Sequence, residues 1–199
     1  GGKSPLLVFD DCDLDLAVEL AVEQFDNSGQ VCLAAVRMLV QDGVYNDFRA
    51  RFLDRASQVV QGDSRDETTG IGPLVSRAHF ERVDGFVTRA LQAGARPILG
   101  GGPNHELNAA TGGFYYRPTV FEGVSAEMEI TCQEVFGPVQ QPMYALRYAG
   151  KGPAPAALAP GAVLFGVVRL CTYLNPHELP RAPALDVDEA AVEAEEEVY

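Results

Sequence analysis

Hydrophobic residues recur at helical spacing in three segments of the chain, at 13–25, 44–60 and 76–93. An apolar stripe that repeats every three or four residues marks the face of a helix that packs on a core. Asp13 is a suitable N-cap for the first helix, and Gly94 fits the C-terminal stop of the third. The side chains expected on the buried faces are Leu14, Val18, Ala21, Val22 and Phe25, then Phe48, Phe52, Leu53 and Ala56, and finally Phe80, Val83, Val87 and Leu91.

Short apolar runs lie between these helical segments and predict strands at 5–9, 36–41, 96–99, 115–120 and 139–144. We expect Asp42 and Gly43 to form a turn before the second helix. Strands that alternate with helices of this length predict an α/β fold with a largely parallel sheet.

Glycine-rich and polar stretches predict loops at 61–73, 100–103 and 134–138. The three glycines at 100–102 have neither the GxGxxG spacing nor the Lys-Ser/Thr pair of a phosphate-binding loop. A plain turn is therefore the favoured interpretation there.

The character of the chain changes near residue 149. Residues 152–161 are rich in Ala, Pro and Gly, which disfavours a continuous helix or strand. Residues 186–199 carry seven acidic residues and no basic one. We therefore expect one folded domain over 1–148 and a loosely ordered, Ala/Pro-rich and acidic tail over 149–199.

The charge distribution disfavours nucleic acid and anionic membranes as partners. The formal net charge of the 199 residues is −13, and −6 remains without the acidic residues of 186–199. Direct phosphate binding requires a basic surface, which this composition does not provide. No apolar run approaches the ~20 residues that a membrane-spanning helix needs.

The cysteines and histidines indicate neither a disulfide framework nor a metal site. Four cysteines (Cys12, Cys32, Cys132 and Cys171) form no CxxC pair, and the three histidines lie far apart in the sequence. This pattern favours reduced thiols in a cytoplasmic protein and gives zinc little support.

Cys32 is the first candidate for chemistry, because it follows a glycine-containing break at the end of the first predicted helix. If a second helix began near Gln30, its free N–H groups could stabilise a thiolate and the oxyanion of an attacked carbonyl. The alternative is a buried structural cysteine, since free cysteine is among the most buried residue types. The pattern alone favours this alternative.

Glu134 is the second candidate, because it lies in a Gly-Pro loop beside Phe136. Its carboxylate could accept hydrogen bonds from ribose hydroxyls, with the Phe136 ring as an apolar wall. A solvated loop carboxylate is the simpler interpretation, and the residues by themselves favour it.

Six short motifs in a fixed order favour the functional interpretations of Cys32 and Glu134 instead, because together they resemble the catalytic domain of the aldehyde dehydrogenase superfamily. The resemblance covers about residues 1–144. The first two motifs are similar to family patterns: GGKSP at 1–5 to the end of E-L-G-G-K-S-P, and DDCDLD at 10–15 to D-A-D-L-D. The next two match them: FDNSGQVC at 25–32 matches F-x-N-x-G-Q-x-C, and GIGPL at 70–74 matches a G-P-L turn. The last two also match: GFYYRPTV at 113–120 matches G-Y-F-x-x-P-T-V, and EVFGPV at 134–139 matches E-x-F-G-P-V.

The resemblance implies a three-layer α/β/α domain and an NAD- or NADP-dependent oxidation of a small-molecule aldehyde to a carboxylic acid. In this family pattern Cys32 matches the nucleophile, which forms a thiohemiacetal and then a thioester. Glu134 matches the carboxylate that binds the nicotinamide ribose, and Phe136 matches the ring beside the nicotinamide. A homo-oligomer or a complementing chain is a possible partner.

The departures from the family pattern limit what we expect of the chain alone. The general-base glutamate would lie two residues before Gly1, and the family's cofactor domain belongs to an N-terminal half. The family's later motifs are not recognisable after residue 144. We therefore expect a fragment with little dehydrogenase turnover. Two alternatives stay open: a non-catalytic module that assembles with a partner chain, and a cofactor-independent thiol esterase.

Overall fold

The computed structural model describes residues 4–125 and 127–146, with side chains described as far as Gln140. The elements in chain order are β1 (Pro5–Val8), α1 (Leu14–Glu23), the 3-10 turn η1 (Asp26–Gly29), β2 (Arg37–Gln41), α2 (Asp42–Ser57), α3 (Arg77–Gln92), β3 (Arg96–Leu99), α4 (His105–Thr111), β4 (Thr119–Glu122), α5 (Glu129–Cys132) and β5 (Val139–Leu146). The tail expected at 149–199 lies outside the described residues. Within the described part of the chain, none of the helices has the length and apolar character to cross a membrane.

The five strands of the described residues form one sheet in the order β1-β2-β5-β4-β3. The β1–β2, β2–β5 and β4–β5 pairs are parallel, and only β3 pairs antiparallel, with β4. This confirms the prediction of an α/β fold with a largely parallel sheet. Because β5 lies at the centre, the 134–138 loop that leads into it arrives in the middle of the molecule.

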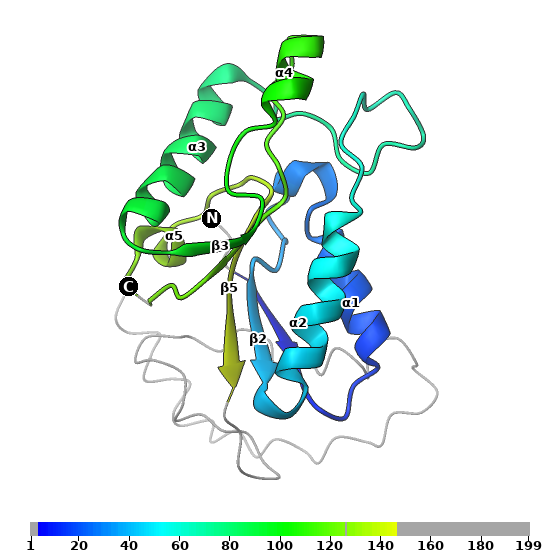
Figure 1. The fold of residues 1–199 in the computed structure, drawn as a ribbon, viewed down its shortest axis with the longest axis vertical. Helices are drawn as coiled ribbons and strands as arrows, with labels where there is room; N and C mark the ends of the chain where they lie inside the picture. Colours follow the sequence, from blue (N-terminus) through cyan, green and yellow to red (C-terminus); the bar gives the residue numbers. More distant parts are fainter. Residues whose placement is uncertain (1–3, 126, 147–199) are drawn as a thin grey trace, which may run out of the picture.

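Helices cover both faces of the sheet, which confirms the three-layer architecture. Figure 1 shows α1 and α2 on one side of the strands and α3 with α5 on the other. Val120 and Phe121 are adjacent in β4 and fully buried, and they belong to two different hydrophobic clusters. Adjacent strand residues point to opposite faces, so each face of the sheet has its own core.

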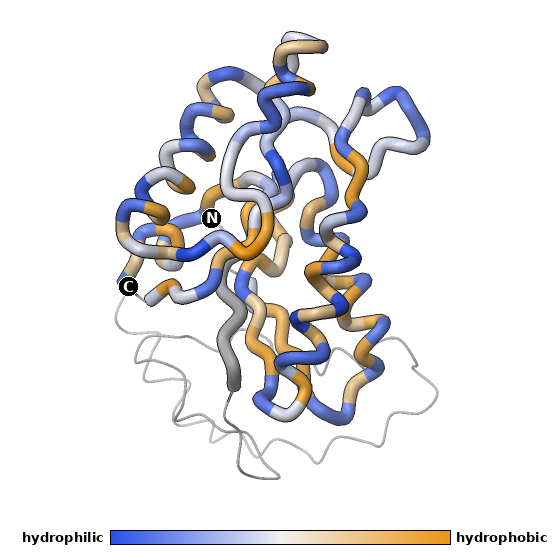
Figure 2. Tube along the Cα trace, viewed as in Figure 1, coloured by the Kyte–Doolittle hydropathy of each residue, from blue (hydrophilic) through white to orange (hydrophobic). Residues whose placement is uncertain are grey.

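The α1–α2 layer is built from the apolar stripes seen in the sequence. Asp13 caps α1 by accepting a hydrogen bond from the Leu16 N–H at 3.1 Å, as expected. Phe25 stacks on Phe52 with ring centroids 6.4 Å apart, which joins the end of α1 to α2. Hydrophilic positions alternate with these apolar ones along both helices (Figure 2).

The turn expected at Asp42 and Gly43 is wrong, because α2 begins at Asp42 directly after β2. Gln41 is both the last residue of the strand and the N-cap, and its side chain is bonded to Asp10 in the turn that follows β1. The positive end of the helix dipole stabilises an acidic residue in the first turn, so Asp42 favours a helix that begins here.

α3 begins as predicted, with the Ser76 Oγ accepting from the His79 N–H at 3.2 Å. Its buried face differs from the prediction at Leu91, which is 39% exposed. Leu91 lies in the last turn of α3, and the core contains instead the small residues Ala90 in this turn and Ala95 after the helix.

The fourth strand is displaced from its predicted position, and a helix that the pattern did not predict precedes it. β4 starts at Thr119 rather than at 115, because Pro118 has no N–H to donate to a strand ladder. The preceding Tyr116 makes only an isolated bridge to Pro103. Between Pro103 and Tyr116 lies the short α4, which ends at Gly112 in the left-handed conformation.

Candidate functional site

Cys32 lies in a strained loop between α1 and β2. Asn27, Ser28 and Gly29 have φ values of 48°, 56° and 67°, so three successive residues adopt the left-handed conformation. For Asn and Ser this conformation costs roughly 1 kcal/mol each or more. Such a backbone persists only where its surroundings hold it.

Hydrogen bonds to the segment before α3 hold the loop. The Ser28 hydroxyl, 2% exposed, donates to the Gly72 carbonyl at 2.5 Å. The Gln30 side-chain oxygen accepts from the Val75 N–H at 3.0 Å. Asn27 and Gln30 also bond to each other's backbone carbonyls, at 3.2 and 2.9 Å. The loop is therefore tied both to itself and to residues 72–75.

Cys32 itself is exposed, which contradicts the alternative of a buried structural cysteine. The structure also contradicts the hypothesis that a second helix begins near Gln30. Residues 30–36 form no helix, and the Gly29 and Gln30 N–H groups bond to the carbonyls of Phe25 and Asn27. The chain has only a short irregular segment before it enters β2, so no second helix can form there.

Two residues that adjoin the Cys32 loop have exposed apolar side chains. One follows Cys32 in the sequence, and the other is hydrogen-bonded to the loop through its backbone. Leu33 follows Cys32 directly, and Val75 is the residue whose N–H bonds to Gln30; both side chains are 80% exposed. The sequence neighbour of Cys32 is thus an exposed apolar residue, and Cys32 is itself accessible.

Glu134 and Phe136 lie in the loop between α5 and β5, as predicted, and both are half-buried. Phe136 has a φ of 59°, a left-handed conformation that is unusual for an aromatic residue. The loop is held from α3. The Arg82 guanidinium donates to the carbonyl oxygens of Glu134, at 2.6 Å, and of Val135, and the His79 Nε2 bonds to that of Phe136 at 2.6 Å.

The structure brings the Cys32 loop and the Glu134 loop into direct contact. A Cβ added at Gly29 would lie 2.1 Å from the carbonyl oxygen of Gly137. The two backbones therefore touch, and only a residue without a side chain fits at Gly29. Two motifs far apart in the sequence thus meet at one place in the fold.

Arg82 and His79, which hold the loop through backbone carbonyls, were not predicted from the sequence. Arg82 occupies an ordinary exposed helix position, and nothing in its neighbouring residues indicates a distant partner. The glycines of both motifs were a usable signal, because a glycine next to a candidate site often marks a close backbone approach.

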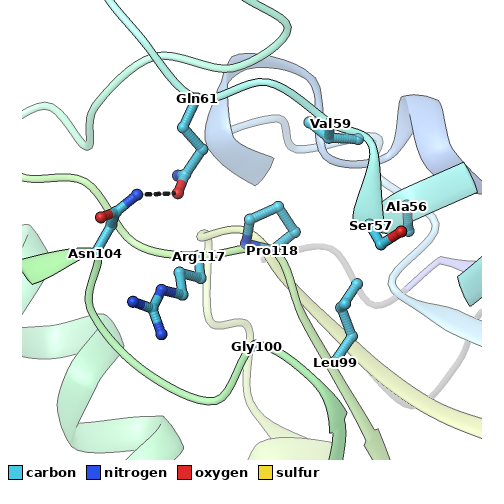
Figure 3. Close-up of a pocket in the computed structure, with 9 residues that line it drawn as sticks. All are labelled: Ala56, Ser57, Val59, Gln61, Leu99, Gly100, Asn104, Arg117 and Pro118. Carbon is cyan, nitrogen blue, oxygen red and sulfur yellow. Dashed lines mark hydrogen bonds between the residues drawn. The ribbon is translucent and has the colours of Figure 1, made fainter. Parts of the chain in front are cut away.

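A shallow cavity of about 310 Å³ lies elsewhere, between the end of α2 and the loop before β4 (Figure 3). It is lined by Ala56, Ser57, Val59, Gln61, Leu99, Gly100, Asn104, Arg117 and Pro118. Gln61 accepts from the Asn104 amide at 3.0 Å and donates to the Tyr116 carbonyl at 2.8 Å. The lining contains no cysteine and no carboxylate, so we place the candidate site at the two loops rather than here.

Comparison with known proteins shows the family of this chain. The model of a family described as the aldehyde dehydrogenase family matches residues 1–145. A betaine aldehyde dehydrogenase from Rhizobium etli is 45% identical over 141 residues, which are 70% of this chain and 28% of that protein. The chain thus spans a little over a quarter of the length of such relatives.

Solved structures show the same similarity. An NAD-dependent aldehyde dehydrogenase from Sinorhizobium meliloti matches with a TM-score of 0.68 and 40% identity, over 74% of this chain and 28% of the other. A betaine aldehyde dehydrogenase double mutant from Staphylococcus aureus, in complex with NAD+, matches with a TM-score of 0.69 and 32% identity, over 74% of this chain and 30% of the other.

Proposed function

Because the chain belongs to the aldehyde dehydrogenase family, we propose that it provides the nucleophile and part of the nicotinamide site for oxidation of an aldehyde to a carboxylic acid. The observation that carries this proposal is the contact between Gly29 and Gly137. It sets the loop with the exposed Cys32 against the loop with Glu134 and Phe136.

In the proposed reaction the Cys32 thiolate adds to the aldehyde carbon and forms a C–S bond and a thiohemiacetal oxyanion. Loss of the aldehyde hydrogen as hydride turns this adduct into a Cys32 thioester. NAD(P)+, when bound, supplies the hydride acceptor. Water then attacks the thioester carbon, the C–S bond breaks, and the acid and the free thiol are released.

The Glu134 loop fits the proposed contact with the cofactor. The Glu134 carboxylate can accept hydrogen bonds from the hydroxyls of a nicotinamide ribose. The half-buried Phe136 ring can form an apolar wall for a flat heterocycle. The NAD+ complex of the Staphylococcus aureus relative supports a nicotinamide cofactor, while neither loop distinguishes NAD from NADP.

Betaine aldehyde is the first substrate to test, because the curated relatives carry that name. We propose that the general base and most of the cofactor site are supplied by other segments of such an enzyme. The exposed Cys32 also favours a second, cofactor-independent activity. In it, an ester acylates the Cys32 thiol with release of the alcohol, and water then hydrolyses the thioester to the acid and the free thiol.

A chimera tests the dehydrogenase proposal. Residues 1–145 replace the matching segment of the Rhizobium etli relative, and formation of NADH from betaine aldehyde is followed. We expect turnover in the chimera, loss of turnover in Cys32→Ala, and normal turnover in the matched Cys132→Ala variant. A folded Cys32→Ala chimera with undiminished NADH formation would refute the role of Cys32.

A further inference from the structure

The Arg82 side chain spans two successive carbonyls of the Glu134 loop. Its guanidinium donates to the carbonyl oxygens of Glu134 and Val135, and its Cζ lies 5.0 Å from the centre of the Phe86 ring. Phe86 is 4% exposed and belongs to the core beneath α3, so the guanidinium rests on a fixed surface. A planar fork of donors on such a support fixes the direction of both carbonyls.

His79 holds the next residue of the same loop. Its Nε2 bonds to the Phe136 carbonyl at 2.6 Å, and its ring meets the Phe136 ring edge-on at 5.9 Å between centroids. A carbonyl only accepts, so this nitrogen carries the proton. Three consecutive carbonyls, from Glu134 to Phe136, are thus bound by two side chains one turn apart on α3. These hydrogen bonds explain how Phe136 keeps its left-handed φ.

The support continues from α3 through Gly137 to the Cys32 loop. A Cβ at Gly137 would lie 2.7 Å from the Val83 side chain, so α3 presses directly on Gly137. Gly137 also touches Gly29. Gly137 is therefore in close contact both with Val83 of α3 and with the Cys32 loop.

The segment that leads into α3 holds the Cys32 loop from a second direction. Gly72 and Val75 bind the Ser28 hydroxyl and the Gln30 side chain. One continuous piece of chain, residues 72–83, therefore contacts both reactive loops. A change in the position of α3 would move the two loops together.

We propose that Arg82 and His79 are positioning residues that fix the spacing between the Cys32 loop and the Glu134 loop. They act through backbone carbonyls and through the Gly137–Gly29 contact. The consequence for catalysis rests on the function proposed above, whereas the coupling between the loops does not.

Amide hydrogen exchange of the 199-residue chain, read by NMR without aldehyde or cofactor, tests this coupling. The Val139 N–H bonds to the Gly137 carbonyl and the Gly29 N–H to that of Phe25, so each reports on one loop. Removal of the charged donor in Arg82→Met should speed exchange at both amides about tenfold or more. Arg82→Lys, which keeps one donor group, should give a smaller increase.

Two comparisons separate positioning from a general loss of stability. Arg77→Met removes the same charge from the same helix, at a position where the guanidinium lies over the Phe114 ring. It should leave the exchange rates of the Gly29 and Val139 amides unchanged. The Ala17 N–H, bonded to Asp13 in the first turn of α1, should also exchange at its original rate in Arg82→Met. The measured quantity is the ratio of the Gly29 exchange rate to the Ala17 exchange rate. If this ratio is no higher in Arg82→Met than in the parent, the proposal is overturned.

His79 provides an independent variant should Arg82→Met fail to fold. His79→Gln retains a donor for the Phe136 carbonyl and should preserve slow exchange at Val139, whereas His79→Leu should lose it. Equal exchange in both variants would exclude a positioning role for His79. Because no dehydrogenase activity enters these measurements, their failure leaves the Cys32 chimera as a separate test of the proposed function.

Discussion

Gly29 and Gly137 meet backbone to backbone, with no room for a Cβ at Gly29. Gly29 lies on the loop that precedes Cys32, and Gly137 lies one residue after Phe136. Their contact is the point at which two distant sequence motifs become one site.

This contact predicts that Gly29→Ala is strongly destabilising. The new methyl group would meet the Gly137 carbonyl in a left-handed residue, which combines a clash with backbone strain. We expect a loss of about 3 kcal/mol or more in the free energy of unfolding, measured by urea denaturation.

Gly112→Ala is the matched control, because Gly112 has a φ of 72° and a Cβ added there would meet nothing within 4 Å. It should lose only the conformational cost, about 1 kcal/mol. Equal losses in the two variants would show that the Gly137 contact contributes nothing.

Chemical modification tests the accessibility and reactivity of Cys32. Cys32 and Cys132 are both exposed, while Cys12 is half-buried. If the surroundings of Cys32 activate its thiol, iodoacetamide should label it faster than Cys132 in the folded chain, as peptide mass spectrometry can measure. Cys32→Ser should abolish any hydrolysis of 4-nitrophenyl acetate, and Cys132→Ser should not. Equal labelling rates for the two exposed thiols would argue against activation.

Glu122 should make stability depend on pH. Its side chain is 12% exposed and lies between Arg49 and Arg96. Burial alone raises the pKa of Glu122, but the hydrogen bonds from the two guanidinium groups outweigh this effect and leave the pKa below its usual value. The resulting stabilisation is present above the unfolded-state pKa of about 4.3 and is lost as the pH falls through the lower folded-state pKa.

Glu122→Gln therefore should cost about 1–2 kcal/mol in unfolding free energy near neutral pH. The difference from the parent should shrink as the pH falls below about 4. Urea denaturation at several pH values measures this difference. A gap that does not change with pH would contradict the ionic origin of the stabilisation.

Tyr116 should resist ionisation. It is 1% exposed, and its hydroxyl donates to Asp84 Oδ1 at 3.1 Å. Burial first, and the negative charge of Asp84 second, raise the pKa of Tyr116 well above its usual range. In a tyrosinate absorbance titration at a pH of about 11, folded Tyr116→Phe should match the folded parent. After unfolding, the parent should show one more tyrosinate than the variant.

Tyr116→Phe should also lose about 1 kcal/mol of stability at neutral pH, since Asp84 loses its donor. The contribution of the hydroxyl is present below pH about 10 and declines as the pH rises above it. A smaller tyrosinate signal in the folded variant than in the folded parent would show that Tyr116 titrates normally.

Local patterns predicted the parts of this fold whose physics is local. The stripes of α1 and α3 and the cap at Asp13 follow from the sequence, because a helix face and its cap involve neighbouring residues. The pattern was wrong where a distant partner decides the outcome. α2 starts at Asp42, where the side chain of Gln41 is bonded to the distant Asp10.

The sequence by itself determined the family, the alternation of strands and helices, and the candidate residues Cys32, Glu134 and Phe136, because these depend on residue types in a fixed order. Their tertiary setting could not be read from that order. Only the fold placed Cys32 in the open without a following helix, and only packing brought Gly29 onto Gly137 and Arg82 onto the carbonyls of the Glu134 loop. Contacts between backbones that are distant in sequence leave no periodic pattern of side chains, so the close approach of the two loops appears only in three dimensions.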